Sequence, residues 1–170
     1  NLYASELARR GHEVKAITLF PERNTGISTK LPYEVIEENV FVRNPAGLDL
    51  LIAGVLKKHE DGTDLFHLHD CGLAAGGGLY RKLGGTKPVS QDLNGYFFCT
   101  NYSLMNGSCH RSCNIAWRIL HAKENLATKI FSSPIRAYQD AGLRFARLID
   151  SFVAVSPFVQ RVYSEWGLPA

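Results

Sequence analysis

A seven-residue stretch near the middle of the chain constrains the fold more than any other segment. It reads Asp64-Leu65-Phe66-His67-Leu68-His69-Asp70, follows a turn-like Asp61-Gly62, and changes from apolar to polar at its end. Continuous apolar character is typical of a strand covered on both faces, so residues 64–68 are predicted to form a central parallel strand. His69 and Asp70 then fall at its carboxyl end, the edge at which open α/β sheets bind ligands.

Helical and strand-like patterns alternate along the rest of the chain. This alternation predicts an α/β fold in one domain of 170 residues, with a Rossmann-like, mostly parallel sheet and helices on both faces. The expected helices cover residues 1–10, 45–59, 72–83, 114–129, 135–148 and 158–166, and the expected strands cover residues 12–20, 64–68, 88–93 and 151–155. Residues 33–43 contain two short β-like pieces, 33–36 and 40–42, which fit a further strand or an edge hairpin.

A second group of polar residues ends the next expected strand. Asp92, Asn94 and Gly95 stand there, followed by a loop-rich segment. Because parallel strands end at the same edge of a sheet, we expect these residues beside His69 and Asp70. All five are candidates for substrate binding in a cleft at this edge, with ordinary polar strand ends as the alternative that the residues alone leave open.

Two histidines of the central strand, His67 and His69, share one face because their spacing is two. As metal ligands they would need further histidine or carboxylate partners. We therefore interpret His67 as a structural residue that packs under a helix and forms one hydrogen bond.

Three of the four cysteines, Cys99, Cys109 and Cys113, occur in one loop. With one more cysteine or histidine they could hold a structural zinc ion, although their spacing is not that of a standard zinc knuckle. Reduced thiols and a disulfide are the alternatives. The sequence contains no secretory signal, which argues against the disulfide. The sequence leaves these three interpretations open.

Two further features invite a phosphate-binding interpretation. Ser156 precedes Pro157 at the start of the last expected helix, where it is predicted to cap the helix and where a substrate phosphate could also bind. The run Gly76-Gly77-Gly78 lacks the Gly-Lys-Ser/Thr of a phosphate loop. We interpret it as a set of small residues that let a helix approach the sheet closely.

The net charge of +3 is unevenly distributed. Residues 1–110 contain 11 Lys and Arg against 12 Asp and Glu, whereas residues 111–170 contain 8 against 4. The basic excess fits solvated helix faces, or a surface that contacts phosphates or an anionic membrane peripherally. No aromatic-basic interleaving or zinc-finger spacing indicates a nucleic-acid partner.

Three segments together resemble one family. Residues 7–14 read LARRGHEV, residues 64–70 form the strand described above, and residues 147–156 read RLIDSFVAVS, with Gly167-Leu168-Pro169 following. In this order they resemble motifs of GT-B glycosyltransferases, most closely glycosyltransferase family 4 (group 1). The resemblance covers nearly the whole chain.

The resemblance implies a hexosyltransferase-type enzyme of cytoplasmic, membrane-associated carbohydrate biosynthesis. Such an enzyme transfers a sugar from a nucleotide sugar to a glycan or lipid-linked acceptor with retention of configuration, and its chemistry requires no cofactor. This chain would be the N-terminal, acceptor-side half, inactive alone, without its first strand and without the C-terminal half that binds most of the donor. Asn94 replaces a histidine common in the family, so it can hydrogen-bond a sugar but cannot carry a proton at neutral pH.

Two alternatives remain open at this point. One is a GT-B-shaped nucleotide-sugar epimerase, which a second domain with two glutamates eight positions apart would argue against. The other is a non-catalytic α/β module that binds a sugar or a protein partner. A reading frame that stops near residue 170 would favour the module.

Overall fold

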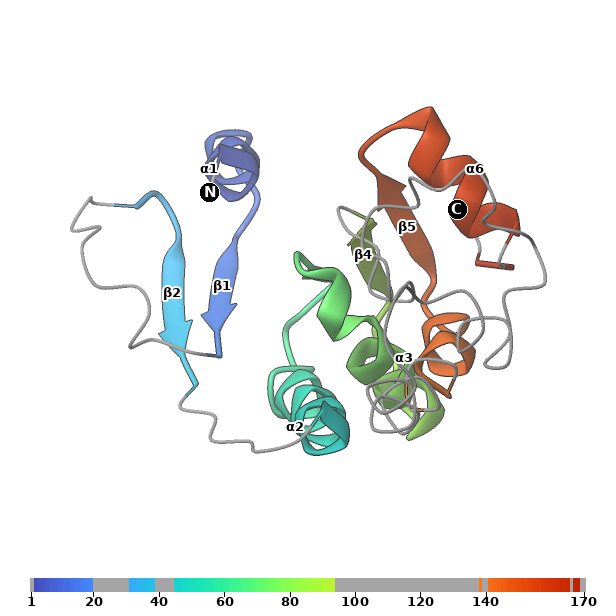
Figure 1. The fold of residues 1–170 in the computed structure, drawn as a ribbon. Helices are drawn as coiled ribbons and strands as arrows, with labels where there is room; N and C mark the ends of the chain where they lie inside the picture. The colour runs from blue at the N-terminus through green and yellow to red at the C-terminus, as the bar shows by residue number, and fades with distance from the viewer. Residues whose placement is uncertain are drawn as a thin grey trace, which may run out of the picture. The chain divides into compact units, whose positions relative to one another are not determined.

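The computed structural model describes residues 2–19, 31–38, 45–93, 138, 141–165 and 167–168 (Figure 1). The chain divides into two compact units, Asn1–Arg43 and Asn44–Ala170. Every strand pair among the described residues is parallel. This confirms the predicted α/β class with parallel strands.

The first unit contains α1 (Leu2–Arg9), β1 (Lys15–Thr18) and β2 (Glu34–Glu37). The two strands pair in parallel, with Ile17 opposite Ile36. Helix α1 ends at Arg9, and Gly11 two residues later has a φ of 90°, a left-handed conformation that favours glycine. Strand β1 is shorter than predicted, β2 agrees with the first of the two predicted pieces, and the second piece, residues 40–42, lies outside the described part of the chain.

The second unit contains a three-stranded parallel sheet in the order β3-β4-β5. Its register places Phe66 opposite Val89 and Leu93 opposite Ala154. In chain order its elements are α2 (Pro45–Lys58), β3 (Phe66–Leu68), the 3₁₀ turn η2 (Cys71–Leu73), α3 (Ala74–Lys82), β4 (Val89–Leu93), β5 (Ser151–Ala154) and α6 (Pro157–Glu165).

The central strand is shorter than the sequence predicts. It begins at Phe66, and Leu65 is exposed before it. Phe66 and Leu68 are both buried, whereas His67 between them is only half-buried. The strand is therefore covered at its apolar positions, and its histidine reaches a partly open face.

The described helices lie close to their predicted positions. The expected helix 114–129 lies outside the described residues, and of the expected helix 135–148 the structure shows residues 138 and 141–146 as helical. Among the helices that the structure describes, none has both the length and the apolar character needed to cross a membrane.

The glycine run of α3 lets this helix touch three neighbours. A Cβ atom added at Gly76 would lie 2.6 Å from Ile52 Cβ of α2, and one at Gly77 would lie 2.6 Å from Leu68 Cδ1 of β3. A Cβ atom at Gly78 would collide with the backbone carbonyl of Phe145 in the helical segment 141–146. The close helix–sheet approach predicted from the sequence is confirmed. The same glycines also let α2 and the helical segment 141–146 pack closely against α3.

A buried carboxylate connects the turn after α2 to the end of α3. Glu60 accepts hydrogen bonds from the Tyr80 hydroxyl (2.9 Å) and from the backbone N–H and hydroxyl of Thr86, and it pairs with Lys57. The hydrogen bond from Lys57, followed by those from Thr86, holds the pKa of Glu60 well below its ordinary value. These contacts fix the segment from which β3 enters the sheet.

Candidate functional site

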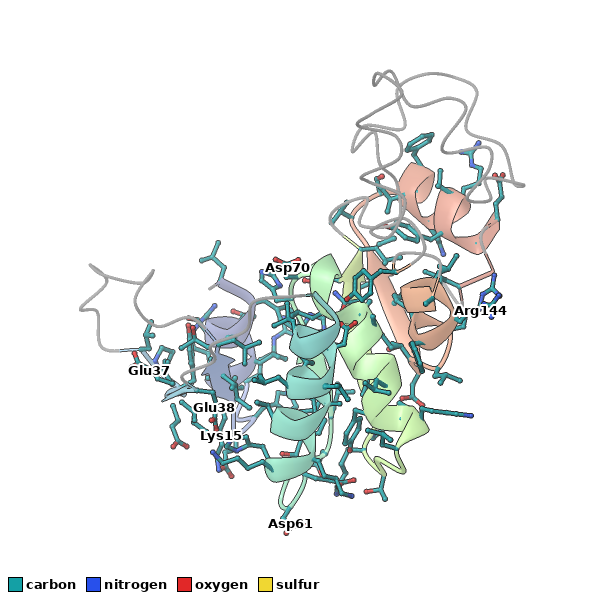
Figure 2. All side chains as sticks on the ribbon, turned by 60° about the horizontal axis from the view of Figure 1, so that its bottom comes forward. Lys15, Glu37, Glu38, Asp61, Asp70 and Arg144 are labelled. Carbon is teal, nitrogen blue, oxygen red and sulfur yellow. The ribbon has the colours of Figure 1, made fainter. Side chains whose placement is uncertain are left out.

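The polar ends of β3 and β4 lie at the same edge of the sheet. The strands pair in parallel with Leu68 opposite Gln91, so His69, the first residue after β3, lies beside Asp92, the next residue of β4. Asp61 before β3 and Asp70 after it are well separated, with Asp61 at the bottom of the view and Asp70 higher up (Figure 2). The predicted proximity is confirmed for His69 and Asp92, whereas Asn94 and Gly95 lie outside the described residues.

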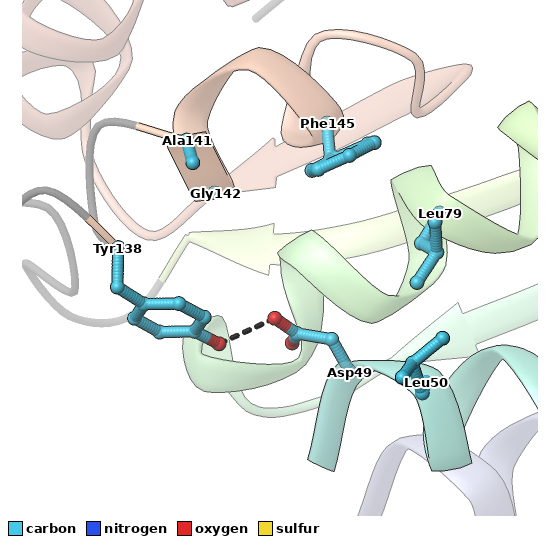
Figure 3. A pocket seen from close by; sticks show the side chains of 7 residues that line it. All are labelled: Asp49, Leu50, Leu79, Tyr138, Ala141, Gly142 and Phe145. Atoms are coloured by element: carbon cyan, nitrogen blue, oxygen red, sulfur yellow. Dashed lines mark hydrogen bonds between the residues drawn. The ribbon is translucent and has the colours of Figure 1, made fainter. Parts of the chain in front are cut away.

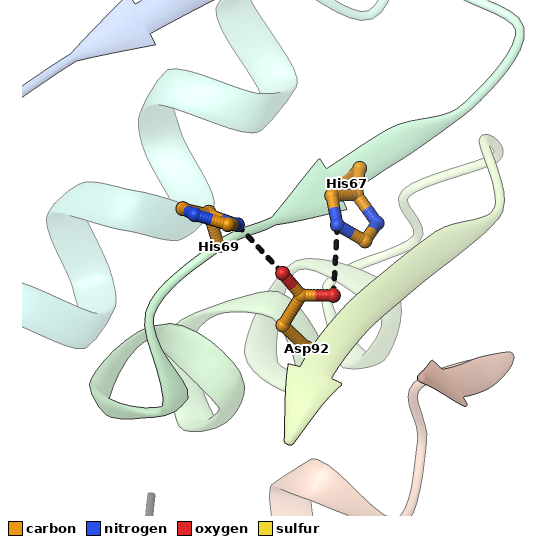
Figure 4. A group of neighbouring side chains, drawn as sticks. All are labelled: His67, His69 and Asp92. Atoms are coloured by element: carbon orange, nitrogen blue, oxygen red, sulfur yellow. Dashed lines mark hydrogen bonds and ion pairs between the residues drawn. The ribbon is translucent and has the colours of Figure 1, made fainter. Parts of the chain in front are cut away.

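Three side chains meet at this edge, and we call His67, His69 and Asp92 the strand-end cluster. His67 Nε2 lies 3.1 Å from Asp92 Oδ1, and His69 Nδ1 lies 2.6 Å from Asp92 Oδ2 (Figure 4). The side chain of His69 is 63% exposed, whereas those of His67 and Asp92 are 22% and 17% exposed. The carboxylate is thus partly sheltered while remaining within reach of solvent.

The cluster offers both acceptors and donors of hydrogen bonds. An ionised carboxylate only accepts, whereas each imidazole nitrogen donates or accepts according to its tautomer. With an imidazole on each oxygen, the Asp92 carboxylate is held in one orientation. Such a group suits a ligand rich in hydroxyls, and the same nitrogen and oxygen atoms are ligands that zinc accepts.

His67 belongs to the strand-end cluster in addition to His69 and Asp92, the two cluster residues that the sequence already predicts at this edge. The sequence predicts a structural role for it, with one hydrogen bond under a helix, and the structure places its imidazole on Asp92. The only sequence signal for this contact is the spacing of two between His67 and His69. The spacing alone does not identify a site. It does so only together with the β3–β4 register, which places the Asp92 carboxylate beside both imidazoles.

Gln91 positions the backbone around the cluster, and no sequence motif indicates this role. Its side-chain Nε2 lies 3.1 Å from the Leu68 carbonyl, 3.0 Å from that of Asp70 and 2.8 Å from that of Asp92. The residue is fully buried. Its amide therefore holds the chain on both sides of His69 and at Asp92.

The other predicted site residues have different surroundings. Asp70 is exposed, and its Oδ1 accepts the backbone N–H of Gly72 (2.8 Å) at the start of η2. Ser156 Oγ accepts the backbone N–H of Val159 (3.3 Å), which confirms its predicted role as the cap of α6. The remaining predicted residues lie outside the described part of the chain: Asn94, Gly95, Cys99, Cys109 and Cys113.

A separate hollow of about 280 Å³ lies among α2, α3 and the segment 141–146 (Figure 3). The Tyr138 hydroxyl donates a hydrogen bond to Asp49 Oδ2 in its wall. Burial raises the pKa of Asp49 despite this hydrogen bond, and burial followed by the contact with Asp49 raises the pKa of Tyr138. The remaining lining residues are Leu50, Leu79, Ala141, Gly142 and Phe145.

This hollow differs in chemistry from the strand-end cluster. Its wall is apolar apart from the Asp49–Tyr138 pair, and it shares no lining residue with the cluster. A polyhydroxyl ligand needs several directed hydrogen bonds. We therefore assign the candidate site to the strand ends.

Comparison with known proteins agrees with this fold. The family model of Glycosyltransferase Family 4 matches residues 2–170. Neither the curated proteins nor the solved structures include a significant match to the chain. Because the family match covers nearly every residue, the chain belongs to glycosyltransferase family 4, as a glycosyltransferase-like domain.

Proposed function

We propose that the chain is the acceptor-side half of a retaining glycosyltransferase. In the proposed reaction the bond between the sugar anomeric carbon and the donor phosphate breaks, and the nucleoside diphosphate leaves with the bonding electrons. A hydroxyl oxygen of a glycan or lipid-linked acceptor forms the new bond to that carbon. The hydroxyl proton passes to the leaving phosphate or to solvent, so the reaction needs no further reactant.

The observation that carries this proposal is the strand-end cluster in a chain of this family. Asp92 can accept a hydrogen bond from an acceptor hydroxyl, and the exposed imidazole of His69 can contact a neighbouring hydroxyl. Directed contacts of this kind orient the attacking oxygen, which is a large part of catalysis by positioning. The nucleotide sugar would be bound mainly by a second, donor-binding half.

The cysteines and the basic surface remain part of the proposal. A zinc ion held by Cys99, Cys109 and Cys113 would stabilise the loop in which they occur, without taking part in transfer. The basic excess of residues 111–170 would support peripheral contact with the membrane that carries a lipid-linked acceptor.

The test is the stereochemistry of donor turnover. The chain joined to its donor-binding half is supplied with α-configured nucleotide sugars (UDP-glucose, GDP-mannose and UDP-N-acetylglucosamine), and the first sugar released is followed by proton NMR. We expect one donor to give the α-anomer first and a transferred sugar when acceptor lipids are added. The 170-residue chain alone should turn over none of them.

Three outcomes would contradict the proposal. Initial release of the β-anomer would exclude retention. Release of a sugar inverted at a ring carbon, with no transfer product, would favour an epimerase. Absence of turnover of any donor by the complete protein, together with saturable sugar binding, would favour a non-catalytic binding module.

A further inference from the structure

The strand-end cluster has the composition of a metal site. One ligand atom from each of its three residues can be chosen so that all three lie within 4.8 Å of one another (Figure 4). Two of the residues come from β3 or directly follow it, and the third comes from β4. The sequence alone offered two histidines without the further ligand that a metal needs, and the strand register supplies it.

The types of ligand restrict the metal. Imidazole nitrogen suits zinc, iron, nickel and copper, whereas magnesium and calcium prefer sites made entirely of oxygen. Two histidines and one carboxylate recur in sites with open coordination positions, in zinc enzymes and in non-haem iron enzymes. A cluster of this kind therefore favours a divalent transition-metal ion that keeps room for an oxygen ligand.

The surroundings hold the three ligands in place. The Gln91 amide contacts the carbonyls of Leu68, Asp70 and Asp92, so the backbone next to each ligand is fixed. Asp92 and His67 are largely sheltered, and His69 lies at the exposed side. A sheltered pair of ligands with a third at the opening leaves a route for the ion to enter.

We propose that His67, His69 and Asp92 bind a divalent transition-metal ion, with Zn²⁺ as the preferred ion and an open position for an oxygen ligand. The ion would lie between the two imidazoles and the carboxylate and would replace their direct contacts. This proposal does not depend on glycosyl transfer, because a binding module could hold the same ion.

Cobalt(II) is the probe that tests the site, because its absorption reports its ligands. Co²⁺ is titrated into the purified, metal-stripped 170-residue chain, and Zn²⁺ is then added in competition. In the chain with Cys99, Cys109 and Cys113 replaced by serine, which cannot form a cobalt–thiolate bond at that loop, we expect visible d–d absorption, and we expect Zn²⁺ to abolish it. A d–d signal that is present in the unaltered chain and lost in this serine variant would assign the metal to the cysteines and overturn the proposal, as would the absence of any d–d signal in both.

Variants locate the ion. His69→Gln and Asp92→Asn should each weaken Co²⁺ binding by at least the ~10- to 100-fold that follows loss of an outer-sphere partner. His12→Gln, at an exposed histidine of the first unit, is the matched control and should bind as the unaltered chain does. Circular dichroism of the same samples checks the fold, and the exposed position of His69 makes its variant informative even if Asp92→Asn unfolds. Equal binding by His69→Gln and the control would overturn the assignment.

Discussion

The Gly78→Ala variant should lose about 3 kcal/mol or more of unfolding free energy, a large share of the stability of a domain of this size. The added methyl group would meet the backbone carbonyl of Phe145, and a backbone carbonyl cannot rotate away as a side chain can. Either α3 or the segment 141–146 must then move, and the packing of α3 on the sheet would suffer. Equilibrium urea unfolding followed by circular dichroism measures the loss.

Gly54→Ala is the matched control for this substitution. Gly54 lies within α2, is exposed, and has no atom within 4 Å of an added Cβ. Alanine there should raise the unfolding free energy by about 0.5–1 kcal/mol, because it is the better helix former. If both variants changed stability in the same direction and by similar amounts, the proposed close contact at Gly78 would be wrong.

The second large effect is expected from Gln91→Glu. The substitution preserves the shape of the side chain but replaces an amide donor, buried against three carbonyl oxygens, with a carboxylate. An uncompensated buried charge costs about 3–5 kcal/mol, so the unfolding free energy at pH 7 should fall by that amount. The loss should shrink as the pH falls, because a protonated glutamate is uncharged and regains one donor.

Gln160→Glu, at an exposed position of α6, tests whether this loss arises from burial. Surface substitutions of this kind usually change stability by less than about 0.5 kcal/mol. Unfolding curves of both variants at pH 7 and at lower pH make the comparison. A Gln91→Glu protein as stable at pH 7 as the Gln160→Glu protein would contradict the hydrogen bonds assigned to Gln91.

The parts of the fold that sequence predicts well depend on local patterns. The central strand and the Ser156 cap are visible within a few residues of sequence; the cap is confirmed, and the strand is confirmed for residues 66–68 of the predicted 64–68. The glycine run predicts a close approach of α3, because only small residues allow it. The polar ends of β3 and β4 were predicted to lie together because parallel strands end at one edge.

The details of the site depend on contacts between strands, which no local pattern encodes. That Asp92 lies between two imidazoles follows from the β3–β4 register, which the sequence does not specify to the residue. Gln91 occupies a position in β4 that a sequence pattern would assign to ordinary sheet packing, and its three carbonyl partners are known only from the structure. For the same reason, the sequence does not identify Asp92 as the carboxylate that contacts both His67 and His69.

The central claim is that the acceptor binds at the strand-end cluster, and the ratio of sugar transfer to donor hydrolysis tests it most directly. Hydrolysis uses water in place of the acceptor, so it reports folding and donor binding without the acceptor contacts. Both rates are measured for the complete protein and for its Asp92→Asn, His69→Gln and His12→Gln variants.

For Asp92→Asn and His69→Gln, the account predicts a transfer rate about 10- to 100-fold lower, the cost of losing a hydrogen bond to a charged group, with unchanged hydrolysis. His12→Gln should leave both rates unchanged. Transfer and hydrolysis that fall together in the cluster variants, or transfer that persists in both of them, would contradict the assignment of the acceptor site.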